Sequence, residues 1–109
     1  LKVGVELKNL LDDVRYQVAH ATYSPDEIAV RFHHRLVVIH PFPNGNGRHA
    51  RMMADLLAAR LGQPRFTWGS RSLTNASLIS ATDTRHCYIA ALQAAHARDY
   101  APLLAFARS

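Results

Sequence analysis

The sequence lacks the features that mark several common classes of protein. It holds one cysteine, Cys87, in 109 residues, so an internal disulfide is excluded, and this fits a reducing compartment such as the cytoplasm. Its apolar runs are interrupted by charges and are shorter than a membrane span requires. Internal repeats and low-complexity tracts are also missing. We therefore expect a cytoplasmic protein that is neither a disulfide scaffold nor a membrane protein.

Acidic residues are scarce relative to basic ones. Eight Asp and Glu face thirteen Lys and Arg, for a net charge of +5, and lysine occurs only at Lys2 and Lys8. The guanidinium of arginine binds phosphate oxygens in pairs, so the excess of arginine favours an anionic ligand. Most of these arginines nevertheless fit an ordinary solvated surface equally well.

Apolar spacing and turn residues together predict a chain of helices. Hydrophobic residues make up 49% of the sequence, and 109 residues are enough for one domain with a buried core. The signals that hairpins require are absent, so we predict an all-α bundle, a single domain over residues 1–109. The expected helices cover approximately residues 5–21, 25–39, 48–61 and 82–97, with a short last helix opening at residues 99–102.

Particular residues support these boundaries. Ser24 is the expected N-cap of the second helix, with Pro25 at its first position and Glu27 closing a capping box. Pro41 ends that helix, because the residue before a proline is driven out of helical geometry. Residues 63–81 leave two alternatives open, since Phe66–Gly69 fits an extended piece or a loop that packs Trp68, and a short helix near 73–80 is possible.

Helical spacing also predicts which side chains are buried. On the first helix the expected apolar face is Leu7, Leu10, Leu11, Val14 and Val18, and on the second it is Ile28, Phe32, Leu36 and Ile39. Near the C-terminus we expect Tyr88, Ile89 and Leu92 to face inward. Met52, Met53 and Cys87 are expected in the core, and His49 on a basic surface.

The segment His40-Pro-Phe-Pro-Asn-Gly-Asn-Gly-Arg48 joins the second and third helices. Gly45 and Gly47 allow positive φ and bring backbone N–H groups close to a ligand, while Asn46 tolerates left-handed geometry or orients the loop. The positive end of the next helix dipole lies at the same place. The sequence therefore predicts an anion-binding loop between two central helices.

Side chains around the loop add to its chemistry. Arg48 and Arg51 lie three positions apart, so both guanidinium groups would reach one phosphate chain. His40 stands at the other edge, where its imidazole is suited to take a proton from a Ser, Thr or Tyr hydroxyl. Phe42, between two prolines, is expected to anchor the loop in the core.

The run HPFPNGNGRHAR, from His40 to Arg51, resembles the signature of the Fic (fido) family, HPFx(D/E)GNGRxxR. The helical pattern on both sides is similar to the Fic core. Within the family, Tyr23–Leu61, Phe66–Gly69 and Pro102–Arg108 look most like the bacterial group called mobile mystery protein B.

The resemblance implies a protein adenylyltransferase that moves AMP from ATP to a hydroxyl group of a target protein, with Mg²⁺ bridging the phosphates. It implies that His40 is the general base and Phe42 the loop anchor. The residues that would bind phosphate are Gly45, Asn46, Gly47, Arg48 and Arg51.

The sequence departs from the family pattern at the expected metal ligand. Asn44 stands where the family has Asp or Glu, and an amide oxygen ligates a hard cation without adding charge. We therefore expect weaker Mg²⁺ binding and weakened turnover. The inhibitory pattern of many relatives, (S/T)xxxE(G/N), is also missing, so we expect inhibition from a segment upstream of Leu1 or from a partner. The chain does not begin with Met, and we expect the N-terminal part of the domain upstream of Leu1.

Several alternative functions remain at this point. A Fic-like module could bind nucleotide with weak turnover or none, or another phosphate-containing group could be transferred. Nucleic-acid binding is less favoured because the arginines are spread along the chain. A zinc site at His33, His34 and His40 lacks suitable ligand spacing.

Overall fold

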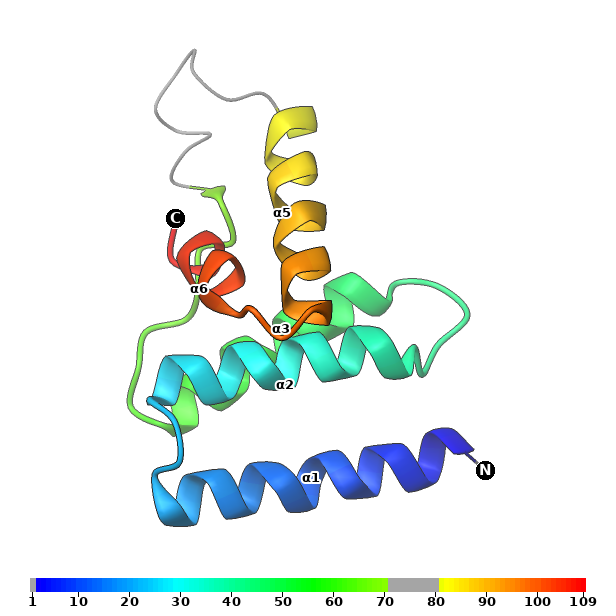
Figure 1. The fold of residues 1–109 in the computed structure, drawn as a ribbon, viewed down its shortest axis with the longest axis vertical. Coiled ribbons are helices and arrows are strands. Elements are labelled where there is room, and N and C mark those ends of the chain that lie inside the picture. Colours follow the sequence, from blue (N-terminus) through cyan, green and yellow to red (C-terminus); the bar gives the residue numbers. More distant parts are fainter. Residues whose placement is uncertain (1, 71–80) are drawn as a thin grey trace. The chain divides into compact units, whose positions relative to one another are not determined.

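The computed structural model describes residues 2–70 and 81–109 (Figure 1). These residues form α-helices and no strand, which confirms the all-α prediction for the part of the chain that is described. None of the described helices is both long and apolar enough to cross a membrane. The helices are α1 (Lys2–His20), α2 (Pro25–Ile39), α3 (Asn46–Arg60), α5 (Ala81–His96) and α6 (Ala101–Ala107).

The chain divides into two compact units, Leu1–Arg65 and Phe66–Ser109. The first unit contains α1, α2 and α3, and the second contains α5 and α6. A single domain over residues 1–109 stays a prediction. The possible short helix near residues 73–80 lies outside the described residues.

Helix α1 begins earlier than expected and buries a narrower face. It starts at Lys2, and Leu10 is its buried residue, at 2% exposure. Leu11 and Val18 are 48% and 42% exposed, so their predicted burial is wrong. Helix α2 is the neighbour that packs against α1 within this unit, and one neighbour covers only one stripe of a helix. Asp13 on α1 accepts a hydrogen bond from Arg35 on α2 at 3.2 Å.

Helix α2 begins and ends where its sequence predicts, but of the predicted capping box only the Ser24 half is confirmed. The Ser24 hydroxyl accepts a hydrogen bond from the Glu27 N–H at 3.2 Å, and Pro25 occupies the first turn. The Glu27 carboxylate accepts from the Arg31 guanidinium at 2.9 Å, and that guanidinium also lies 3.8 Å from the centre of the Tyr23 ring. The Ser24 cap is therefore present, and the Glu27 carboxylate stabilises the first turn through an i,i+4 ion pair.

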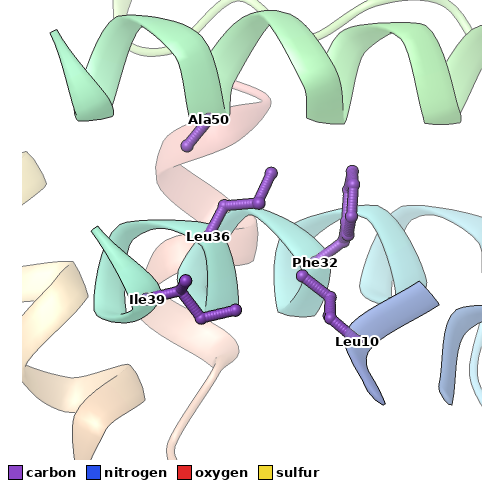
Figure 2. Close-up of a cluster of buried hydrophobic side chains, with 5 residues drawn as sticks. All are labelled: Leu10, Phe32, Leu36, Ile39 and Ala50. Atoms are coloured by element: carbon purple, nitrogen blue, oxygen red, sulfur yellow. The ribbon is translucent and has the colours of Figure 1, made fainter. Parts of the chain in front are cut away.

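The core of the first unit lies between α2 and its two neighbours. In Figure 1, α2 runs antiparallel to both α1 and α3. Figure 2 shows Phe32 and Leu36 pointing from α2 toward α3, with Leu10 of α1 beside Phe32. The predicted apolar face of α2 is confirmed, since Ile28, Phe32, Leu36 and Ile39 are all buried.

Small side chains line the face of α3 that meets α2. Ala50, Ala54 and Ala58 recur every fourth residue and have 0% exposure, as does Ala29 on α2. Methyl side chains let two helix backbones approach closely, so α3 is held along its length against α2. Met52, at 54% exposure, lies on the outer side of α3 and its predicted burial is wrong, whereas Met53 packs against the core.

In the second unit, residues 66–69 run without helix beside the end of α6. The Thr67 and Trp68 N–H groups both donate to the carbonyl of Ala107, at 2.8 and 3.0 Å. Phe66 is buried at 3% exposure, with the Arg108 guanidinium 4.1 Å from its ring centre. This outcome favours the loop over the extended piece for Phe66–Gly69, with Trp68 half-buried beside Phe66.

Small residues also dominate the buried side of α5. Ala91 and Ala95 are buried, Tyr88 stacks near Phe106 of α6 at 5.4 Å, and Leu92 is half-buried. Ile89 is 39% exposed and Cys87 is exposed, so both are placed differently from the prediction. The buried residues of α5 include alanines, which the spacing of large apolar residues does not predict.

Gly69 gives a test of packing in the second unit. It has φ +81°, and a Cβ added there would lie 2.8 Å from Thr84 Cγ2 and 2.9 Å from Phe106 Cε1. We expect Gly69→Ala to destabilise the unit by about 2–5 kcal/mol, combining left-handed strain with overpacking. Chemical denaturation followed by the fluorescence of the single tryptophan, Trp68, measures this.

Gly62→Ala is the matched control, because Gly62 has nearly the same φ, +82°, with nothing within 4 Å of the added Cβ. Followed by circular dichroism, this control should lose only the roughly 1–2 kcal/mol of backbone strain. Equal losses in the two variants would contradict the packing described around Gly69.

Candidate functional site

The predicted loop connects α2 to α3 and lies wholly within the first unit. In Figure 1 it projects at the end of the unit where α1 begins. Helix α3 starts at Asn46, two residues earlier than expected, so Gly47 and Arg48 belong to its first turn. The first N–H groups of a helix have no acceptor within the helix, and they point toward this loop.

His40 caps the end of α2 in an unusual backbone conformation. Its φ is 55° and its ψ 60°, the left-handed region, and its N–H donates to the carbonyl of Leu36 at 3.1 Å. Such a conformation costs a non-glycine residue roughly 1–2 kcal/mol. The following Pro41 excludes a further helical turn, and the imidazole of His40 is left exposed. The predicted base is therefore accessible at the edge of the loop.

Of the two loop glycines, Gly45 adopts the left-handed geometry. It is the N-cap of α3 with φ 75°, and its carbonyl accepts the first helical bond, from the His49 N–H at 3.0 Å. The expectation of positive φ at Gly47 is wrong, because Gly47 is helical and contributes its N–H from within the first turn. Because Gly45 has no side chain, the N-cap residue itself does not bond to the N–H groups of the first turn.

Arg48 turns back toward the start of its own helix. Its Nη2 lies 3.9 Å from the position that a Cβ on Gly45 would occupy, and the side chain is exposed. Long side chains on a helix lean toward the N-terminus, which explains this direction. The structure therefore brings a guanidinium, the first-turn N–H groups and the N-terminal end of the helix dipole to one place.

Asn46 holds the loop together from within. It is buried, at 7% exposure, and its Oδ1 accepts from the Phe42 N–H at 2.9 Å. Its Nδ2 donates to the Phe42 carbonyl at 2.7 Å and lies 3.2 Å from His40 Nε2. The single side chain thus connects the end of α2, the middle of the loop and the start of α3.

Phe42 is placed differently from the prediction that it anchors the loop in the core. Its ring is 45% exposed and meets the half-buried His49 edge-on, with 4.8 Å between ring centres. The backbone of Phe42, rather than its ring, is held, by the amide of Asn46. His49 was expected on a basic surface, and its contact with Phe42 spans a turn whose geometry the sequence pattern does not reveal.

Asn44, at the expected metal position, has an exposed side chain. Its amide oxygen would offer a cation one neutral ligand. Across the described residues, no group of three or more His, Cys, Asp or Glu is arranged to hold a metal ion.

His33 is a buried residue of α2 that contacts α3 near the loop. Its side chain has 0% exposure and bonds to the backbone of Ala50 on α3. Burial lowers the pKa of His33 from 6.5 to about 4, with a smaller contribution in the same direction from the nearby Arg51 charge. The neutral ring therefore joins α2 to the turn that carries Arg51, which is half-buried. His34 is also buried, at 7% exposure, whereas His40 is exposed.

Comparison with known proteins agrees with this geometry. Residues 3–58, just over half of the chain, match the model of the Fic/DOC family. A relative named "Protein adenylyltransferase fic-1" from Caenorhabditis elegans is 32% identical over 101 residues, covering 93% of this chain and 17% of the relative. Its Caenorhabditis briggsae counterpart is 32% identical over 102 residues, covering 92% of this chain and 18% of the relative.

A third relative, "Protein adenylyltransferase Fic" from Aedes aegypti, is 33% identical over 84 residues, covering 77% of this chain and 14% of the relative. The chain thus spans less than a fifth of the length of these relatives. All three come from animals, so they lend no support to the predicted likeness to a bacterial group. No solved structure matches the chain.

The burial of His33 predicts that stability depends on pH. Because its pKa of about 4 lies below the ordinary 6.5, the unfolded chain binds a proton that the folded chain does not. The free energy of unfolding therefore has its full value from this group above pH 6.5. It decreases by roughly 3 kcal/mol as the pH falls toward 4. Urea denaturation from pH 7.5 to 4 measures it. His33→Gln should flatten the slope in this window, and His86→Gln, at an exposed position, controls for the loss of a surface histidine. An unchanged slope in His33→Gln would contradict this role.

Proposed function

Because this chain belongs to the Fic/DOC family, we propose that it carries the catalytic loop of a protein adenylyltransferase, which transfers AMP from ATP to a hydroxyl group of a target protein. The observation that supports this most is the meeting of an exposed imidazole, His40, with the open N-terminus of α3 at one loop. An anion site and a base are the two elements that such a transfer requires.

In the proposed reaction, the triphosphate of ATP lies at the start of α3. The N–H groups of Gly47 and Arg48 and the Arg48 guanidinium neutralise the phosphate oxygens, and Arg51 adds charge one turn further along. Asn44 would offer a bound Mg²⁺ one neutral oxygen ligand, and the cation would supply positive charge that stabilises the leaving group.

His40 accepts the proton of the target hydroxyl while the hydroxyl oxygen attacks the α-phosphorus. The new bond joins that oxygen to phosphorus, the bond from the α-phosphorus to the bridging oxygen breaks, and pyrophosphate leaves. The target, which would carry a Ser, Thr or Tyr hydroxyl, gains AMP. His40 is the only titratable side chain of residues 40–48 apart from Arg48, and arginine stays protonated, so the base is assigned to the imidazole.

The transfer is tested with ATP labelled at the α-phosphate, the full chain, Mg²⁺ and a cell lysate. We expect the label on protein and its loss by about 100-fold or more in His40→Ala, the usual contribution of a general base. His86→Ala, at an exposed position outside the loop, should label as the unchanged chain does. Labelling that survives in His40→Ala would overturn the assigned base.

The same assay with γ-labelled ATP separates the reaction from phosphate transfer. AMP transfer puts the α-label on protein and leaves the γ-label in pyrophosphate. A γ-label on protein would instead support transfer of a different phosphate-containing group.

The neutral side chain of Asn44 favours one alternative, a nucleotide-binding module with weak turnover. Asn44→Asp adds a carboxylate at the loop, so we expect half-maximal labelling at a lower Mg²⁺ concentration and a higher rate at limiting Mg²⁺. Asn44→Ala is the matched control and should raise the Mg²⁺ requirement. A module without turnover would bind ATP in all three forms, seen as thermal stabilisation, and would label nothing unless the carboxylate were restored.

We also propose that activity is restrained from outside the described residues, by a partner or by a segment not contained in this sequence. This proposal rests on the missing (S/T)xxxE(G/N) pattern.

A further inference from the structure

The orientation of the Asn46 amide follows from its two bonds to Phe42. Oδ1 accepts from the Phe42 N–H at 2.9 Å, and Nδ2 donates to the carbonyl of the same residue at 2.7 Å. Turning the amide over would set its NH₂ against an N–H and its oxygen against a carbonyl oxygen, which loses both bonds. The nitrogen of the amide is therefore the atom that faces His40.

This orientation determines the protonation of the His40 ring. The Asn46 Nδ2 lies 3.2 Å from His40 Nε2, and an amide NH₂ group only donates. His40 Nε2 must then accept, which requires that it carry no proton. In a neutral imidazole with a bare Nε2, the proton sits on Nδ1.

We propose that Asn46 is a positioning residue that holds His40 in the tautomer with a bare Nε2, ready to accept a proton. The catalytic meaning of this inference rests on the proposed function, because only a general base needs to present a lone pair to the target hydroxyl. Its structural content, the tautomer of the unliganded protein, is independent of that function.

The backbone at both ends of the contact supports this role. His40 is held in left-handed geometry by its bond to Leu36, and Asn46 is the first residue of α3 and is buried. Neither side chain needs to search for the other, so the contact costs little conformational entropy beyond folding. The amide is already engaged by Phe42, so phosphate at this site would meet main-chain N–H groups rather than the Asn46 side chain.

The arrangement also defines how the base is released for the reaction. Nε2 has one lone pair in the ring plane, so it accepts either from Asn46 or from an arriving hydroxyl, and the exposed His40 ring turns from one to the other. The two bonds to Phe42 keep the amide in position during this exchange. The hydroxyl proton then passes to the bare Nε2.

Long-range proton–nitrogen NMR of histidine-labelled protein at pH 8, without nucleotide, tests the tautomer. His40 is assigned from the signal lost in His40→Ala. We expect a proton on Nδ1 and a bare Nε2 in the unchanged chain. In Asn46→Asp one carboxylate oxygen still accepts from Phe42, while the other faces Nε2 and only accepts, so Nε2 should become protonated. The same tautomer in both proteins would overturn the proposal.

Two further variants make the result decisive. Asn44→Asp adds the same charge two positions earlier, at an exposed side chain, and should leave the His40 tautomer as in the unchanged chain. A switch in this variant as well would overturn the specific role of Asn46. If Asn46→Asp does not fold by circular dichroism, Asn46→Ser supplies the test, because a shorter hydroxyl loses the fixed donor. It should shift His40 toward the Nε2-protonated tautomer that histidine favours in water.

The labelling assay is run separately on the same proteins. The expected tautomers without any AMP transfer would remove the proposed function and leave this inference standing. Transfer that depends on His40, together with an unchanged tautomer in Asn46→Asp and Asn46→Ser, would remove the inference and leave the function.

Discussion

The buried amide of Asn46 is the interaction on which the rest of the site depends. A loop that leaves one helix in left-handed geometry at His40 and enters the next through left-handed Gly45 has few hydrogen bonds of its own. Asn46 forms hydrogen bonds with the N–H and the carbonyl of Phe42. These bonds satisfy the polar atoms of the buried amide, whose burial would otherwise cost free energy. The same side chain meets His40, which links the shape of the loop to the chemistry of its base.

The hydrogen bonds of Asn46 depend on the packing of α2 against α3. Alanines along α3 bring the two helices together, and the buried ring of His33 bonds to the backbone of Ala50 among them. Ala50 lies one turn beyond the start of α3, so this contact sets the position of the N–H groups that would receive phosphate. Keeping His33 neutral avoids a buried charge beside Arg51.

These contacts lie in residues 1–65, and the family match falls within the same unit. The chain covers only a small share of its relatives, and several large apolar side chains are exposed, among them Phe42 and Met52. The proposed site has its loop and its imidazole within this unit, whereas Asn44 offers an exposed amide where the family pattern has a carboxylate. We therefore expect this departure from the pattern to affect turnover more than nucleotide binding.

The sequence by itself determined the helices of the first unit, the loop, and the residues with which its chemistry is built. Periodicity, the Ser24 cap and Pro41 are local signals, and they placed α2 correctly. Tertiary structure decided what local signals do not contain. It decided that Phe42 is held by its backbone rather than its ring, that Leu11 and Val18 stay partly exposed, and that His33 is buried. It also decided the orientation of the Asn46 amide. Its nitrogen faces His40 because the N–H and the carbonyl of Phe42 fix which end of the amide each of them meets.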